Sequence, residues 1–189
     1  MDRIPVLLIV LRFLLGPALY ALVAANAPGV WVIAGATAGF LSDVFDGIIA
    51  RRLGVATERL READSWTDTW YYIWVAAAAW RANPETIAAY AVPLLAVLGL
   101  QALCWAIDFA KYRRFATYHQ YSAKLWGITL FLAAVALLGF RQAGPFLWLT
   151  IAAGALSLVE GIAMTLVLPR WTHDVKGLWH ALELRRSAP

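Results

Sequence analysis

Four aspartates are the most informative residues of the sequence, because acids rarely lie in such apolar surroundings. Asp43 and Asp46 are three residues apart, and Asp64 and Asp68 are four residues apart. Each spacing places the two carboxylates of a pair on one face of a helix, one turn above the other. Ionisable groups inside a membrane cost about 3 kcal/mol each and normally face a polar cavity. Because a short stretch of chain joins the two pairs, we expect the four carboxylates to converge.

Converging carboxylates repel one another unless cations neutralise them. Neither His nor Cys accompanies these acids, and hard oxygen ligands of this kind suit Mg²⁺ or Mn²⁺. A simpler interpretation is that the acids cap helices or pair with arginines of the loops, as acids near helix starts often do. That interpretation stays open for Asp64 alone, whereas four acids at these spacings favour a metal site.

The residues that follow Asp46 extend this site. Gly47 and Ala50 share the face of the carboxylates, and small side chains there let a ligand approach the backbone. Arg51 adds a planar, permanently charged group that suits a phosphate. Gly47 alone would be typical of helix packing in membranes. Its place between the aspartates and the arginine instead indicates a phosphate-bearing ligand.

The composition predicts the kind of protein that positions these residues. Of the 189 residues, 62% are hydrophobic and only 15% are charged, and the mean hydropathy is +0.66. Soluble domains are about half apolar and a quarter charged. The sequence therefore predicts an integral membrane protein and argues against a disordered chain, a nucleic-acid-binding module and an ordinary cytosolic enzyme. A single cysteine, Cys104, excludes an intrachain disulfide.

Apolar stretches of about 20 residues are long enough to span a membrane as helices. We predict a single all-α domain over residues 1–189, with an amphipathic tail over 172–186 that lies on the cytoplasmic leaflet. The loops on one side hold only Arg81 and Arg141, so the positive-inside rule places both termini in the cytoplasm. Six transmembrane helices are expected, over residues 5–24, 30–49, 64–80, 86–109, 118–140 and 145–168.

The pattern around the aspartates resembles the signature of the CDP-alcohol phosphotransferases of phospholipid synthesis. That signature is Asp-x2-Asp-Gly-x2-Ala-Arg-x8-Gly-x3-Asp-x3-Asp, and it aligns with residues 43–68. Seven of its eight fixed residues are present at unchanged spacing, and Leu60 replaces the second glycine. The first predicted helix also resembles the opening helix of this family, which carries an arginine like Arg12. The resemblance extends to the plan of six helices.

The resemblance implies a reaction in which an alcohol attacks the β-phosphorus of a CDP-linked lipid and CMP leaves. Two Mg²⁺ or Mn²⁺ ions, bridged by carboxylates, would neutralise the diphosphate and stabilise the leaving group. By the resemblance, Asp43, Asp46 and Asp64 bind metal, and Asp68 is both a ligand and the base that takes the proton of the alcohol. The CDP-lipid site is then formed by Gly47, Ala50, Arg51 and Thr57.

The acceptor alcohol is less clearly marked in the sequence. Lys124 lies in a segment that resembles a lysine-bearing segment of the family and would pair with a phosphate or carboxylate of the substrate. The alternative is that Lys124 extends to the membrane interface. Arg113 and Arg114 either bind a phosphorylated alcohol or only orient the chain in the membrane. Asp108 either binds a hydroxyl-rich substrate or pairs with Lys111.

Other interpretations stay open. The signature also fits a water-soluble CDP-alcohol donor with a diacylglycerol acceptor, although the short chain favours CDP-diacylglycerol as the donor. Intramembrane acids occur in cation transporters too, but here they cluster near one side and no inverted repeat is visible. Leu60 is compatible with an inactive family member. The resemblance also implies a homodimer, and the size and the lack of a targeting segment favour a prokaryotic plasma membrane.

Overall fold

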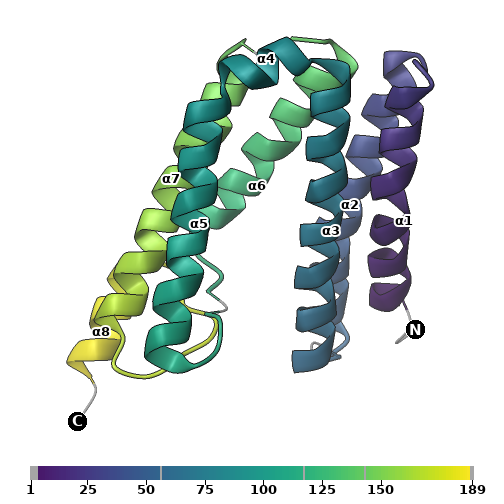
Figure 1. Ribbon diagram of the computed structural model, residues 1–189. Helices are drawn as coiled ribbons and strands as arrows, with labels where there is room; N and C mark the ends of the chain where they lie inside the picture. The colour runs from purple at the N-terminus through teal and green to yellow at the C-terminus, as the bar shows by residue number, and fades with distance from the viewer. Residues whose placement is uncertain (1–3, 56, 117, 143, 188–189) are drawn as a thin grey trace. The chain divides into compact units, whose positions relative to one another are not determined.

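The computed structural model describes residues 4–55, 57–116, 118–142 and 144–187, and every regular element in these ranges is a helix. This confirms the predicted all-α fold (Figure 1). The elements are α1 (Ile4–Ala24), α2 (Gly29–Arg52), α3 (Glu58–Ala82), α4 (Pro84–Ala89), α5 (Ala91–Tyr112), α6 (Tyr121–Ala134), the π-helix η1 (Val135–Gly139), α7 (Gly144–Val167) and α8 (Leu178–Arg186).

One of the predicted helices is not continuous, and that prediction was wrong in this respect. The helix expected over 86–109 is divided at Tyr90 into α4 and α5. Pro93 accounts for the break, because its ring clashes with the carbonyl of residue 89 and proline has no N–H to donate to that carbonyl. The helix expected over 118–140 begins at Tyr121 and ends in the π-helical turn η1.

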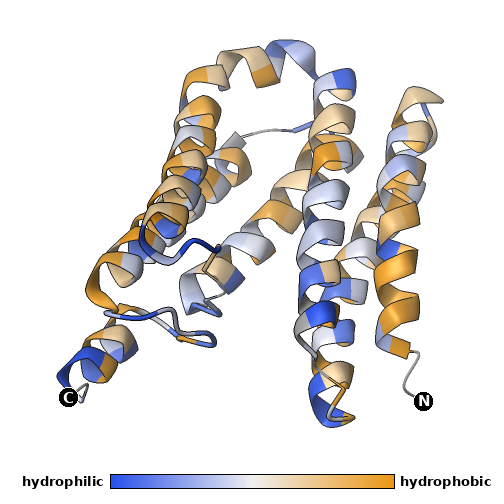
Figure 2. Cartoon of the chain, turned by 60° about the horizontal axis from the view of Figure 1, so that its bottom comes forward, coloured by the Kyte–Doolittle hydropathy of each residue, from blue (hydrophilic) through white to orange (hydrophobic). Residues whose placement is uncertain are grey.

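Five helices among the described residues are long and apolar enough to cross a membrane: α1, α2, α5, α6 together with η1, and α7. The chain is therefore an integral membrane protein with several spans, as predicted. The sixth expected span, 64–80, lies within the 25 residues of α3, which is not among the five. Figure 2 shows why, since α1 is mostly orange whereas α3 is largely white and blue.

The chain divides into two compact units, and the first comprises residues 1–87 and 133–143. In this unit α1 packs along both α2 and α3, and η1 packs on α2 (Figure 1). The Phe13 and Trp70 rings stack with centroids 5.0 Å apart, and the Trp70 indole N–H donates to the Phe13 carbonyl at 3.1 Å. The apolar core of the unit is formed by Leu19, Val32, Ala36, Ala78, Ala79, Leu137 and Leu138.

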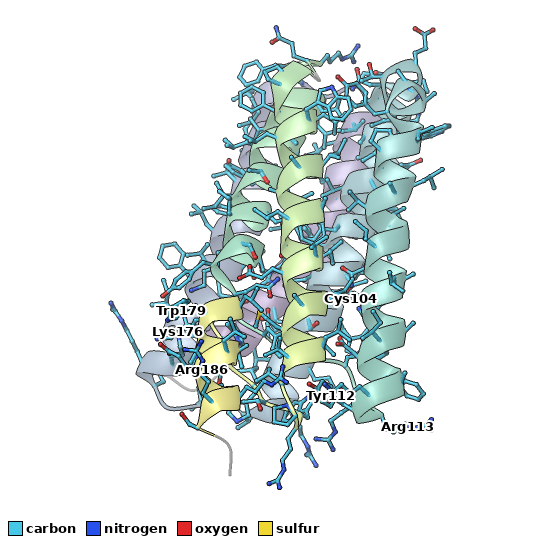
Figure 3. All side chains as sticks on the ribbon, turned by 90° about the vertical axis from the view of Figure 1, so that its left-hand side faces the viewer. Cys104, Tyr112, Arg113, Lys176, Trp179 and Arg186 are labelled. Atoms are coloured by element: carbon cyan, nitrogen blue, oxygen red, sulfur yellow. The ribbon has the colours of Figure 1, made fainter. Side chains whose placement is uncertain are left out.

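The second unit comprises residues 88–132 and 144–189, and within it α5 lies beside α7 (Figure 1). Helix α8 packs on α7 (Figure 3), where Trp179 and Arg186 mark its position. Since the single-domain prediction concerns how the two units are joined, it stays a prediction. The apolar cluster between α7 and the tail contains Met164, Leu168, Val175 and Ala181.

The tail is less helical than the sequence indicates. Its helix begins at Leu178, so the prediction of an amphipathic helix over 172–186 was wrong for the first part of that range. Val175 lies before this helix and is fully buried. The apolar residue that α8 leaves most open is Trp179, with 71% of its surface exposed. Apolar contact with α7, rather than helix periodicity, therefore determines how the tail folds.

Glu160 of α7 joins three elements of the second unit. Its side chain accepts a hydrogen bond from the Ser122 hydroxyl at the start of α6. Its other oxygen accepts the backbone N–H of Leu178 at 3.0 Å. The Leu178 N–H is the first of α8, where Gly177 offers no side-chain cap, so Glu160 satisfies a helix end that would otherwise lack a partner.

Gly154 of α7 packs against the Trp126 ring, and this contact predicts the outcome of a substitution. A methyl group added at Gly154 would come within 2.7 Å of Trp126 Cε2. Gly154→Ala should therefore lower the free energy of unfolding by about 1–3 kcal/mol through overpacking. In Gly99→Ala, the matched control, nothing lies within 4 Å of the added carbon. Thermal unfolding of both variants in one detergent, followed by circular dichroism, measures the difference, and an unchanged Gly154→Ala variant would contradict this packing.

Candidate active site

The carboxylates of the two predicted pairs come together in the first unit. Helix α2 carries Asp43 and Asp46, and α3 carries Asp64 and Asp68. One carboxylate oxygen from each of Asp43, Asp64 and Asp68 lies within 4.8 Å of the others. This group contains only oxygen ligands, so its chemistry fits Mg²⁺ or Mn²⁺. The structure thus confirms the predicted convergence and defines three acids that could hold an ion.

The four acids differ in how open they are. The side chain of Asp46 is only 4% exposed, whereas those of Asp43, Asp64 and Asp68 are 43%, 33% and 35% exposed. The three open acids are the same three whose oxygens lie close together. A cation or a polar substrate therefore reaches this group from outside, while Asp46 lies behind it within the helical packing.

Arg12 of α1 was linked in the sequence only to the opening helix of the family, and its contact with the aspartates was not predicted. It is 1% exposed and pairs with all four aspartates. Its Nη1 donates to Asp43 Oδ1 and to Asp64 Oδ1, each at 3.0 Å, and also contacts Asp68. Its Nη2 donates to Asp46. A permanently charged side chain in an apolar helix needs an anionic partner, and this rule could have linked Arg12 to the acids from the sequence.

The start of α3 explains the role of one residue predicted for the CDP-lipid. Thr57 is the N-cap of α3, and its hydroxyl accepts the backbone N–H of Leu60 at 3.3 Å. This bond satisfies one of the free donors at the helix start and fixes where α3 begins, two turns before Asp64. Leu60 replaces the glycine of the signature, yet its backbone forms this capping bond. A contact between Thr57 and the nucleotide stays a prediction.

The other predicted CDP-lipid residues lie on α2 directly after Asp46. A methyl group added at Gly47 would lie 3.3 Å from Arg51 Nη1, so the guanidinium of Arg51 folds back over Gly47. Ala50 is buried and Arg51 is exposed. The small residue at position 47 therefore leaves room for the charged group beside the acidic face. The structure brings Gly47 and Arg51 together as expected, and their contact with a ligand stays a prediction.

The predicted acceptor residues belong to the second unit. Arg113 ends α5 in the left-handed conformation, with φ of 57°. The Arg114 guanidinium lies 5.1 Å from the centre of the Trp171 ring, and Lys124 Nζ lies 5.2 Å from the centre of the Tyr121 ring. Figure 3 labels Arg113 at the end of α5, beside Tyr112. These cations stack on aromatic rings, and their binding of an acceptor stays a prediction.

Asp108 is buried in a hydrogen-bond network, and its binding of a hydroxyl-rich substrate stays a prediction. It accepts the Thr165 hydroxyl at 2.7 Å and the Ala116 N–H at 3.2 Å. The Tyr118 hydroxyl lies 3.0 Å from that of Thr165, and because burial raises the pKa of Tyr118, it remains a neutral donor. Lys111 donates to the carbonyls of Thr165 and Leu166 rather than to Asp108. Asp108 therefore holds the loop after α5 against α7.

The fold and this site define a membrane protein with several spans and a hard-cation site beside a small-residue face and an arginine. The family model of CDP-alcohol phosphatidyltransferase matches residues 3–167, so the chain belongs to this family. Neither a curated protein nor a solved structure matches the chain. Family membership confirms the resemblance seen in the sequence and identifies a membrane transferase of phospholipid biosynthesis that carries out CDP-alcohol phosphotransfer.

The three open aspartates predict how metal binding responds to substitution. Asp64→Asn removes one charged ligand of the group and should weaken Mn²⁺ binding at least about tenfold, because affinity for hard cations depends on the charge of the ligand set. Glu62→Gln is the matched control, since Glu62 is an exposed acid on the same helix outside the group. Each detergent-solubilised variant is titrated with Mn²⁺, and the electron paramagnetic resonance signal of the free ion gives its affinity. Equal affinity in the two variants would contradict the assignment.

Proposed function

We propose that the protein transfers a phosphatidyl group from a CDP-diacylglycerol-type lipid to a small alcohol and releases CMP. The observation that carries the proposal is the group formed by Asp43, Asp64 and Asp68, whose oxygens lie within 4.8 Å of one another in a chain of this family. Phosphoryl transfer needs charge neutralisation and alignment more than covalent help from the protein, and a carboxylate cluster suits that need.

The proposed reaction is a displacement at the β-phosphorus of the donor. The hydroxyl oxygen of the acceptor forms a bond to the β-phosphorus of the donor, and the bond from that phosphorus to the bridging oxygen breaks. CMP departs with the bridging oxygen, and the hydroxyl proton passes to Asp68. Asp68 suits this role because its side chain is 35% exposed at the open side of the group. Bound Mg²⁺ or Mn²⁺, as one or two ions, would neutralise the diphosphate and stabilise the departing CMP.

Each remaining site residue has a proposed task. Asp43, Asp46 and Asp64 hold metal together with Asp68, with Asp46 as the most deeply buried acid of the set. Gly47 and Ala50 let the diphosphate approach α2, and Arg51 supplies a permanent charge for it. Thr57 contacts the nucleotide from the start of α3. The acceptor is met by Lys124, Arg113 and Arg114, whose charges suit an alcohol that carries a phosphate or carboxylate, while Asp108 holds the loop that follows α5.

We propose that α3 is the sixth transmembrane helix. With six spans both termini lie on the same side of the membrane, which we propose is the cytoplasmic side. Its polar character is explained by the site, because α3 places Asp64 and Asp68 against Arg12 of α1 rather than toward lipid. Basic residues at the end of α2, Arg51 and Arg52, put the site at the cytoplasmic face under the positive-inside rule. A homodimer, implied by the family, is part of the same proposal.

The reaction is tested by CMP release from CDP-diacylglycerol in mixed micelles with Mn²⁺ or Mg²⁺. The acceptors are glycerol 3-phosphate, serine, inositol and inositol phosphate, each supplied alone. We expect release with one acceptor, loss of release in EDTA, and a decrease of about 10²–10⁴-fold in Asp68→Asn, as the loss of a general base predicts. Glu62→Gln is the control and should keep the wild-type rate.

Three outcomes would contradict this proposal or a part of it. Release from a CDP-alcohol with diacylglycerol as acceptor, and none from CDP-diacylglycerol, would reverse the assignment of donor and acceptor. No release with any pair of substrates, in protein that still binds Mn²⁺, would indicate that Leu60 has abolished catalysis. Wild-type activity in Asp68→Asn would remove Asp68 from its proposed role as the base.

A further inference from the structure

We propose that Arg12 is a positioning residue that gathers the four carboxylates and competes with the divalent cation for them. Metal binding then displaces the guanidinium, which becomes free to pair with the diphosphate of the donor. This inference rests on the metal site of the proposed function and adds a residue that the signature over 43–68 does not contain.

The contacts of Arg12 coincide with the candidate metal group. Its Nη1 touches one oxygen from each of three acids, at 3.0 Å for Asp43 and Asp64 and also in contact with Asp68. These are the three residues whose oxygens lie within 4.8 Å of one another. Hard divalent cations bind oxygen at about 2.1 Å, so an ion that uses these oxygens needs the space that Nη1 fills. The nitrogen and the ion exclude each other.

One guanidinium does not neutralise the four carboxylates, so the site still attracts a further cation. The four acids carry four negative charges, and Arg12 supplies a single positive one. The remaining negative charge draws a divalent cation into the group. Once such an ion is bound, it repels a guanidinium only a few ångströms away. Arg12 therefore holds the acids together until an ion binds. Because the ion must first displace the guanidinium, Arg12 lowers the affinity of the four acids for that ion.

The surroundings of Arg12 limit where it can pair again. Among the described residues, Arg12 also hydrogen-bonds to the Ser42 hydroxyl, 3.5 Å from Nε, and that hydroxyl itself donates to the Gly39 carbonyl at 2.7 Å. A buried arginine that loses a carboxylate needs another anion. The diphosphate of the donor is the anion that the proposed reaction brings to this place, and the planar guanidinium suits it.

The test compares Mn²⁺ binding by the wild type, Arg12→Gln, Arg12→Lys and Ser42→Ala, measured by electron paramagnetic resonance in detergent. We expect Arg12→Gln to bind Mn²⁺ at least tenfold more tightly and to need less Mn²⁺ for activity, while its maximal rate falls because the diphosphate loses a partner. Arg12→Lys should lie between the two, since one ammonium cannot replace a guanidinium with two donor nitrogens. Ser42→Ala keeps all four ion pairs and should match the wild type.

If Arg12→Gln does not fold, the proposal is still tested by a second measurement, made on the wild type. The Nε–H signal of Arg12, assigned by its absence in Arg12→Lys, should shift or broaden as Mg²⁺ saturates the protein in a nitrogen–proton correlation spectrum. An unchanged signal at saturation would overturn the inference. Folded Arg12→Gln that binds Mn²⁺ as weakly as the wild type, or more weakly, would also overturn it.

The same experiment separates the two proposals. If the wild type binds Mn²⁺ and Asp64→Asn does not, the metal site of the proposed function stands, and the Arg12 variants alone decide the inference. If the wild type binds no Mn²⁺, both the metal site and the competition are wrong.

Discussion

The neutralisation of clustered negative charge is the constraint on which the first unit depends. Two neighbouring helices bring four carboxylates together, and carboxylates so closely placed repel one another unless a cation neutralises them. Arg12 meets this need from a third helix, and its pairs with all four acids hold α1, α2 and α3 together at this end. The arginine is almost completely buried, so its charge is balanced by the acids rather than by water.

This charge cluster explains why the two ends of the unit have such different character. Away from the acids, α1, α2, α3 and η1 share an ordinary apolar core around Leu19, Val32 and Leu137. Toward the acids, α3 exchanges apolar residues for polar ones, and for this reason it is the one long helix without the hydropathy of a span. A helix that carries half of a charged site cannot also present an apolar surface all round.

The sequence alone predicts those features of the site that depend on the spacing of residues within one helix. The three- and four-residue separations of the aspartates fixed which carboxylates share a face, and the structure brings three of them into one group. Spacing could not show that Arg12 meets them, because that contact spans 31 to 56 residues of chain. Likewise Val175 is buried through contact with α7, and Asp108 finds Thr165 across 57 residues. Periodicity within a segment carries no information on such partners.

The most direct test of this account is an anomalous diffraction map from crystals of the protein grown with Mn²⁺. The account predicts an anomalous peak among Asp43, Asp64 and Asp68, with the Arg12 guanidinium moved away from their Oδ1 atoms. A peak elsewhere in the chain, with Arg12 still paired to all four aspartates, would contradict it.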